Sequence, residues 1–386
     1  MTKTIAVLGA GTMGTGIAQI AATFQHDVIL FDKHKDMLDY SRKNLTRILN
    51  RQVEKERMMS EQVNDILGRI ASVTDLKYIK EADVVIEAII EDTEIKQDLY
   101  KQVEPLVDDE AIIATNTSSL SVASLSSTFE KPERFLGIHF FNPAPLMPLV
   151  EIVPSVVTEE TVTQNARDLI DSWKKTTVLA KDLPGFIVNR IARPFYGEAL
   201  RIYEEGLADP ATIDWAMKEL GGFRMGPFEL MDFIGNDVNQ KVSETVFEAF
   251  YYDPRFRPSL TQKRMAEAGL LGRKTERGFY DYREGSYNPE PVKNEQKGQQ
   301  ILDRILTMLI NQAADAYWLG VASKDEIDLA MTKGVNYPKG LLAWADEIGL
   351  QKIVERMDEL YTRFREDRYR CCPLLRDMAA EGEAFF

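Results

Sequence analysis

Residues 5–14 read Ile-Ala-Val-Leu-Gly-Ala-Gly-Thr-Met-Gly, an apolar run that leads directly into the pattern G-x-G-x-x-G. A second apolar run over residues 28–31 ends at Asp32, 18 residues after Gly14. A strand, a glycine-rich turn, a helix over about residues 13–24 and a strand that ends in an acidic residue form a βαβ unit of the dinucleotide-binding kind. The chain is therefore expected to begin with a doubly wound α/β sheet.

The glycines of this turn indicate how the ligand would be held. Gly9 permits a tight turn off the strand, Gly11 lets the backbone approach a pyrophosphate, and Gly14 lets the helix pack closely on the sheet. The pyrophosphate would lie at the N-terminus of the helix, beside Thr12 and Met13, where N–H groups and the helix dipole favour an anion.

Asp32 indicates which dinucleotide binds. Its carboxylate can accept hydrogen bonds from both hydroxyls of the adenosine ribose, and its charge repels a 2′-phosphate. NAD is therefore favoured over NADP, although Lys33 and His34 weaken this exclusion.

The composition limits the class of protein. A chain of 386 residues with 44% hydrophobic content fits two or three globular domains. No apolar run approaches the ~20 residues of a membrane span, and the first strand leaves no room for a signal peptide. The only cysteines, Cys371 and Cys372, are adjacent, so we expect a cytoplasmic protein without a metal site. The net charge of −14 argues against nucleic acid or anionic membranes as partners.

Strand and helix signals alternate up to about residue 180, which predicts a mostly parallel sheet. The charged segment 35–61 has apolar residues at helical spacing and predicts a long helix or a helical hairpin. The expected strands cover residues 4–8, 28–31, 84–86, 111–114, 135–140, 149–153 and 176–179.

Beyond Pro184 and Gly185 the pattern is helical throughout, with a second break at the proline-rich residues 287–291. We therefore predict three domains: a Rossmann-type domain at 1–183 and two all-α domains at 184–288 and 289–386. We call the latter two the first and the second helical copy, because a constant shift of 114 residues aligns them. This shift pairs Arg190 with Arg304, Ala199 with Ala313, Ile213-Asp214 with Ile327-Asp328, Met217 with Met331, Gly226 with Gly340 and Asp232 with Asp346.

Four polar residues are candidates for chemistry. Ser118 follows one apolar run, His139 lies near the end of another, and Glu151 interrupts a third. Ligands of doubly wound sheets bind at the carboxyl ends of the strands, where Ser118 and His139 fall. Oxidation of an alcohol needs a base for the hydroxyl proton, a task that suits His139, and a buried Glu151 beside it would stabilise the imidazolium. Ser118 and Asn189 could hydrogen-bond the substrate oxygens.

Each of these residues also has a structural interpretation. His139 could be a satisfied strand histidine, Glu151 a charge at a strand edge, Ser118 a helix cap and Asn189 an exposed amide. The residue types alone leave both interpretations open.

Several segments occur in the order and spacing of the L-3-hydroxyacyl-CoA dehydrogenases, and the chain resembles the 3-hydroxybutyryl-CoA dehydrogenase branch of that family. The resemblance covers residues 1 to about 285, and the tail resembles a second helical copy found in longer members. The segments that carry it are Gly-Ala-Gly-Thr-Met-Gly, Asn-Thr-Ser-Ser-Leu, His-Phe-Phe-Asn-Pro-Ala-Pro, Pro-Gly-Phe-Ile-Val-Asn-Arg, Met-Gly-Pro-Phe-Glu-Leu-Met-Asp and Gly-Phe-Tyr-Asp-Tyr.

The resemblance implies NAD-dependent, reversible oxidation of a (3S)-hydroxyacyl-CoA to the 3-oxoacyl-CoA. It implies that His139 is the general base, Glu151 its partner, and Ser118 and Asn189 the substrate-positioning residues. The other residues that it assigns are Asp32 at the ribose, Glu91 and Lys96 near the nicotinamide, and Lys55 as a contact of the CoA moiety.

The second helical copy departs from the family pattern. Asp303 stands where the first copy has Asn189, and no dinucleotide unit accompanies the second copy. We expect a structural, non-catalytic copy that pairs with the first inside one chain, about a pseudo-twofold axis. The chain could also form a homodimer.

Two other functions remain open from the sequence. The chain could oxidise a different 3-hydroxy acid on the same fold, or it could be a structural protein without turnover, as a lens crystallin of this family is.

Overall fold

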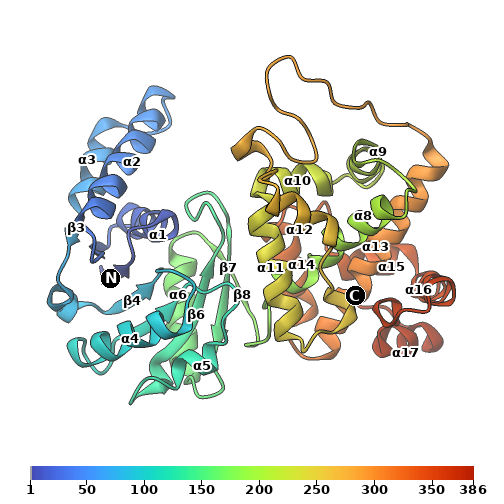
Figure 1. Cartoon of the computed structure of the whole chain (residues 1–386). Coiled ribbons are helices and arrows are strands. Elements are labelled where there is room, and N and C mark those ends of the chain that lie inside the picture. Colours follow the sequence, from blue (N-terminus) through green and yellow to red (C-terminus); the bar gives the residue numbers. More distant parts are fainter. Residues whose placement is uncertain (1) are drawn as a thin grey trace. The chain divides into compact units, whose positions relative to one another are not determined.

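The computed structural model describes residues 2–386 and divides into two compact units, one ending at Leu183 and one beginning at Pro184 (Figure 1). The division into three domains stays a prediction. The second unit contains both helical copies. Among the described residues, no helix is both long and apolar enough to cross a membrane.

The first unit is built on one sheet of eight strands in the order β3-β2-β1-β4-β5-β6-β7-β8. All neighbouring strands are parallel except β6 and β7, which are antiparallel. The predicted doubly wound, mostly parallel sheet is therefore confirmed. The strands are β1 (Thr4–Leu8), β2 (Asp27–Phe31), β3 (Ile70–Val73), β4 (Val84–Glu87), β5 (Ile112–Thr115), β6 (Phe135–Phe140), β7 (Leu149–Pro154) and β8 (Thr176–Leu179).

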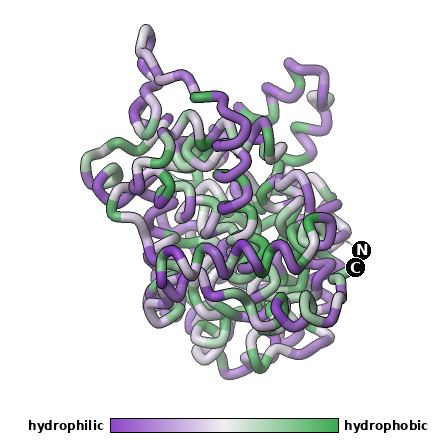
Figure 2. Tube along the Cα trace, turned by 90° about the vertical axis from the view of Figure 1, so that its right-hand side faces the viewer, coloured by the Kyte–Doolittle hydropathy of each residue, from purple (hydrophilic) through white to green (hydrophobic). Residues whose placement is uncertain are grey.

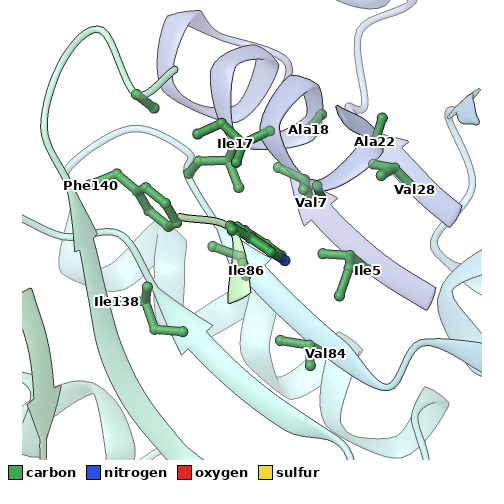
Figure 3. Packing of buried hydrophobic residues seen from close by; sticks show 14 of the residues in the cluster. Ile5, Val7, Ile17, Ala18, Ala22, Val28, Val84, Ile86, Ile138 and Phe140 are labelled. Atoms are coloured by element: carbon green, nitrogen blue, oxygen red, sulfur yellow. The ribbon is translucent and has the colours of Figure 1, made fainter. Parts of the chain in front are cut away.

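Helix α1 (Thr12–Thr23) packs on this sheet and also against α2 and α3, so most of its small and apolar residues are buried. In Figure 3 its residues Ile17, Ala18 and Ala22 lie over side chains from several strands, including Val7, Ile86 and Phe140. The other helices of the unit are α2 (Lys35–Glu54), α3 (Ser60–Gly68), α4 (Thr93–Val103), α5 (Val122–Ser126) and α6 (Glu160–Ser172).

Two local features differ from the sequence prediction or refine it. Of the two alternatives predicted for residues 35–61, the helical hairpin is present, formed by α2 and α3, and it extends beyond that segment to Gly68. Strand β3 was not predicted, because its residues Ile-Ala-Ser-Val carry little apolar pattern and only Ile70 is buried.

The second unit is all-helical. Its elements repeat at the predicted shift of 114 residues: α10 (Pro227–Ile234) matches α15 (Leu341–Ile348), and α9 (Pro210–Trp215) with the π-helical turn η4 (Ala216–Leu220) matches α14 (Lys324–Gly334). Hydrophobic and hydrophilic residues alternate along the trace, as amphipathic helices require (Figure 2). The remaining helices are α7 (Val188–Ile191), α8 (Arg193–Glu204), α11 (Asn236–Ala249), α12 (Leu260–Glu267), α13 (Glu295–Trp318), α16 (Leu350–Phe364) and α17 (Pro373–Glu381).

The long helix α13 of the second copy packs against α7, α8, α9 and η4 of the first copy. Two arginines at equivalent positions reach across this contact in opposite directions. Arg190 of the first copy pairs with Asp315 of the second at 2.8 Å, and Arg304 of the second copy pairs with Glu198 of the first at 2.6 Å. Apolar residues at matching places in the two copies are all buried: Leu200, Ile202, Ile213, Met217, Ile305, Leu309, Ile327 and Met331.

Candidate active site

The glycine-rich turn connects β1 to α1 at the point where the order of the sheet reverses, between β1 and β4. Gly9 has a φ of 106°, and a Cβ there would lie 2.6 Å from the carbonyl oxygen of Ala88. A Cβ on Gly14 would lie 1.8 Å from the carbonyl oxygen of Gly9. A Cβ on Gly11, in contrast, would meet none of the described atoms within 4 Å. The first and last glycines thus permit close packing within the protein, whereas Gly11 borders open space that suits a pyrophosphate.

Asp32 follows the last residue of β2 and is held in place by two backbone donors. Its Oδ2 accepts a hydrogen bond from the Ala10 N–H, and its Oδ1 accepts one from the His34 N–H, both at 2.9 Å. Each carboxylate oxygen has a further lone pair for a ribose hydroxyl. The residues present therefore fit the adenosine half of NAD.

His139 and Glu151 face each other across the antiparallel pair β6 and β7. The Nδ1 of His139 lies 2.7 Å from Oε2 of Glu151, and both side chains are buried. Because a carboxylate only accepts hydrogen bonds, this contact requires a proton on Nδ1 of His139. The antiparallel register explains how residues twelve apart in sequence form one hydrogen-bonded pair.

Ser118 lies in the loop that follows β5, the strand next to β6. The Oε1 of Glu91 accepts hydrogen bonds from the Ser118 N–H at 2.9 Å, from Thr117 Oγ1 at 2.6 Å and from Ser119 Oγ at 3.2 Å. Burial alone would raise the pKa of Glu91, but the Lys96 ammonium and the hydrogen bonds from Thr117 and Ser118 outweigh it and lower the pKa. Glu91 therefore stays ionised and fixes the serine loop.

Lys96, on α4, is 1% exposed. Its Nζ is 3.3 Å from Glu91 and 2.6 Å from Glu87, a carboxylate that is fully buried. Glu87 also accepts hydrogen bonds from Tyr100 and Thr115 at 2.6 and 2.8 Å. The burial of Lys96 favours an indirect role, in which Glu87 holds Lys96, Lys96 holds Glu91 and Glu91 holds the loop.

The sequence interpretation missed Glu87, although an acidic residue at the end of the apolar strand Val-Val-Ile-Glu is an available signal. It also missed Asn116, whose Oδ1 accepts a hydrogen bond from the Phe140 N–H at 2.8 Å. This bond ties the loop after β5 to the residue that follows His139. Asn116 thus couples the positions of the serine loop and the histidine strand.

A lysine organises the connection between β6 and β7. The Nζ of Lys175 donates hydrogen bonds to the carbonyl oxygens of Ala144 at 2.6 Å and Met147 at 2.8 Å. Burial lowers the pKa of Lys175 to about 8. Lys175 therefore helps to hold the segment that joins the strand of His139 to the strand of Glu151.

Asn189 and Lys55 are the other two residues predicted to bind substrate. Asn189 is a half-buried residue of α7 in the second unit. Lys55 is exposed and follows the last residue of α2. The substrate-binding roles of both residues stay predictions.

The position equivalent to Asn189 in the second copy is occupied differently. Asp303 forms an ion pair with Arg356 of α16. Residues 2–386 also contain no cluster of three or more histidine, cysteine or acidic side chains arranged to hold a metal ion.

Comparison with known proteins gives consistent matches along the whole chain. Residues 4–183 match the family model of the 3-hydroxyacyl-CoA dehydrogenase NAD-binding domain. The model of the 3-hydroxyacyl-CoA dehydrogenase C-terminal domain matches twice, at residues 185–282 and 301–384.

Three relatives illustrate the similarity. The 3-hydroxyadipyl-CoA dehydrogenase of Escherichia coli is 35% identical over 98% of this chain and 97% of its own length. The crystal structure of 3-hydroxybutyryl-CoA dehydrogenase from Escherichia coli superposes with a TM-score of 0.92 at 34% identity and covers 99% of both chains. The (S)-3-hydroxybutyryl-CoA dehydrogenase structure from Ralstonia eutropha superposes with a TM-score of 0.71 at 37% identity, covering 74% of this chain and all of its own.

Proposed function

Because the chain belongs to the 3-hydroxyacyl-CoA dehydrogenase family, an NAD-dependent oxidoreductase family, we propose that His139, Glu151, Ser118 and Asn189 are the residues that carry out its reaction. The proposed substrate is a short-chain (3S)-hydroxyacyl-CoA. The observation that carries the assignment is the buried His139–Glu151 pair, with 2.7 Å between Nδ1 and Oε2.

In the oxidation direction, Nε2 of His139 removes the proton of the 3-hydroxyl group. The buried carboxylate of Glu151 stabilises the imidazolium that results. NAD, when bound, supplies the hydride acceptor. In the reverse direction the imidazolium returns its proton to the carbonyl oxygen.

Ser118 and Asn189 are proposed to hydrogen-bond the 3-oxygen and the thioester carbonyl. The fixed position of Ser118 supports this role, because its N–H donates a hydrogen bond to Glu91, which in turn pairs with Lys96. Orientation of the reacting groups by a rigid site accounts for a large part of many rate enhancements.

The relatives are named for two acyl groups, 3-hydroxyadipyl and 3-hydroxybutyryl. We propose a short acyl chain for this protein, with or without a terminal carboxylate. The adjacent free cysteines Cys371 and Cys372 are in keeping with work in a reducing cytoplasm.

We further propose that residues 184–288 form the catalytic helical copy and that residues 289–386 are its structural partner, related to it by a pseudo-twofold axis. The ion pairs of Arg190 and Arg304, which run between the copies in opposite directions, support this pairing. The ion pair of Asp303 with Arg356 supports a structural role for the second copy.

A pair of histidine variants tests the catalytic assignment. We expect His139→Gln to lower kcat for acetoacetyl-CoA reduction by roughly 10²- to 10⁴-fold while NADH binding stays near normal. His26→Gln is the matched control, because His26 is equally buried but accepts a hydrogen bond from the Lys3 N–H and has a structural role. A His139→Gln variant that kept more than about a tenth of the wild-type kcat would contradict the assignment.

A further inference from the structure

Asp182 lies in the short segment through which the chain leaves the first unit. We call residues 180–183 the exit segment, because they follow the edge strand β8 and precede Pro184, where the second unit begins. At the start of this segment the Ala180 N–H donates a hydrogen bond to the carbonyl oxygen of Ile152 at 2.9 Å. Ile152 follows Glu151 on β7, so the exit segment is tied to the strand of a proposed site residue.

The side chain of Asp182 binds the first turn of α5, the helix that follows the serine loop. Its Oδ1 accepts a hydrogen bond from the Val122 N–H at 3.0 Å. Its Oδ2 accepts bonds from the Ala123 N–H at 2.7 Å and from Ser121 Oγ at 3.2 Å. Hydrogen bonds to an ionised carboxylate are stronger than those between neutral groups. The exit segment and the start of α5 are therefore joined by a half-buried carboxylate that accepts three hydrogen bonds.

This contact lies at one end of the serine loop, and the contact with Glu91 lies at the other. Thr117 Oγ1 and the Ser118 N–H, at the start of the loop, donate to Glu91 at 2.6 and 2.9 Å. Ser121, at the end of the loop, donates to Asp182 and is the N-cap of α5. The loop that carries Ser118 is thus held at its start by Glu91 and at its end by Asp182.

The Asp182 contact joins elements on either side of the His139–Glu151 pair. Strand β5 leads into the serine loop and β8 leads into Asp182, and between them in the sheet lie β6 and β7, which carry the pair. The second helical copy has no equivalent contact, because the shift of 114 residues places Gln296, a residue of α13, at the position of Asp182. The contact therefore belongs to the exit from the first unit, beside the proposed site.

We propose that Asp182 is a positioning residue that fixes the exit segment relative to Ser118. Asn189 follows Asp182 by seven residues, so the contact limits where the chain can carry Asn189. This inference rests on the proposed function, in which Ser118 and Asn189 bind the same substrate. A loose exit segment would leave each unit folded but would weaken the joint binding of the thioester by the two residues.

Two variants separate this role from simple stabilisation of α5. Asp182→Ala removes all three hydrogen bonds of the contact. Ser121→Ala is the matched control, because it removes the side chain that caps the same helix by accepting the Ser124 N–H at 3.1 Å. It leaves the two backbone bonds to Asp182 in place. Steady-state kinetics with acetoacetyl-CoA, the Kd of NADH and the melting temperature are measured for both variants and for wild type.

We expect Asp182→Ala to lower kcat/KM for acetoacetyl-CoA by roughly 10- to 100-fold, while the Kd of NADH changes by less than about twofold. The KM of acetoacetyl-CoA should rise, whereas partial unfolding alone would lower kcat and leave KM unchanged. Ser121→Ala should keep kcat/KM within about threefold of wild type. Asp182→Asn, which keeps one acceptor oxygen, should lie between Asp182→Ala and wild type.

Equal losses of kcat/KM in Asp182→Ala and Ser121→Ala would overturn the inference, because the effect would then come from α5 alone. An unchanged KM in Asp182→Ala would overturn it as well. A wild type that does not reduce acetoacetyl-CoA would refute the proposed function, and this inference with it. An active wild type with an unaffected Asp182→Ala variant would refute this inference only.

Discussion

The two helical copies share a framework but differ where the first is expected to contact substrate. In the first copy the carboxylate of Asp214 accepts hydrogen bonds from the N–H groups of Phe228 and Glu229, both at 2.9 Å. In the second copy Asp328 accepts them from Leu342 and Ala343 at 2.8 and 2.9 Å. Every residue of the second set lies 114 positions after its counterpart. The contact that starts α10 and α15 has therefore been kept in both copies.

A glycine belongs to each of these contacts. A Cβ on Gly226 would lie 2.3 Å from the Asp214 carboxylate, and one on Gly340 would lie 2.2 Å from the Asp328 carboxylate. Only glycine permits the approach, so both positions are constrained by packing alone.

The position of Asn189 behaves differently. Its counterpart Asp303 is an acid bound to Arg356, a pairing that suits a surface ion pair rather than substrate binding. The fold thus constrains the contacts that start these helices in both copies, whereas the position of Asn189 is free to differ, as expected if only the first copy meets substrate.

Removal of the second copy should have the largest effect. A chain that ends at Asn288 loses α13, which packs on α8 and η4, and leaves Glu198 without Arg304. We expect aggregation or a new dimer, because a large apolar face becomes exposed. Light scattering on the full and shortened chains measures this, and an unchanged mass with unchanged stability would contradict intramolecular pairing.

Arg304 and Arg190, which form the ion pairs between the two copies, should contribute differently to the free energy of unfolding. Arg304→Met leaves the buried Glu198 with the Tyr369 hydroxyl alone and should lower the free energy of unfolding by about 3–5 kcal/mol. Arg190→Met should cost less, because Asp315 keeps Arg255 at 2.9 Å. Urea denaturation of both variants gives the two values, and the reverse order would refute this account of the contact.

Exchange of the site residue between copies addresses the comparison directly. Asn189→Asp should lower kcat/KM by roughly 100-fold, since a donor to the substrate is replaced by a charge that only accepts. Asp303→Asn should leave kcat/KM within about twofold, because the site that it would restore has no cofactor domain. Steady-state assays with acetoacetyl-CoA measure both, and equal effects at the two positions would contradict a single catalytic copy.

The smallest expected effect is a pH dependence of the free energy of unfolding, caused by Asp214 and Asp328. Burial raises the pKa of Asp214 to about 7, although hydrogen bonds from Tyr280 and two backbone groups act against it. Between pH ~4 and 7 the folded state then holds more protons than the unfolded state. The free energy of unfolding therefore falls as the pH rises through this range, with a slope of at most about 1.4 kcal/mol per pH unit. Burial also raises the pKa of Asp328.

Urea denaturation of wild type, Asp214→Asn and Asp328→Asn at pH 5 and 7.5 tests these signs. The stability of wild type relative to either variant should fall as the pH rises. A relative stability that did not depend on pH would show that these carboxylates titrate normally.

The sequence predicted much of this molecule because the relevant signals are local. The βαβ unit, seven of the eight strands and the repeat follow from patterns that lie within short windows. His139 and Glu151 could be proposed as partners, and the antiparallel register of β6 and β7 brings them together.

Other features depend on residues that are distant in sequence. Glu87 gains its importance from Lys96 and Thr115, which reach it from a helix and from the neighbouring strand. Among the described residues, Arg193 is buried without a carboxylate at ion-pair distance, which only the folded chain reveals. Such buried polar contacts arise from tertiary packing and not from local propensity.

The crossed ion pairs of Arg190 and Arg304 also bear on how this protein behaves on dilution. Two separate helical domains would associate according to mass action and would part below their dissociation constant. Here both partners belong to one chain, and a short linker keeps them at an effective concentration on the order of millimolar. The face between the copies therefore stays covered even in a cell that contains only a few molecules of the protein.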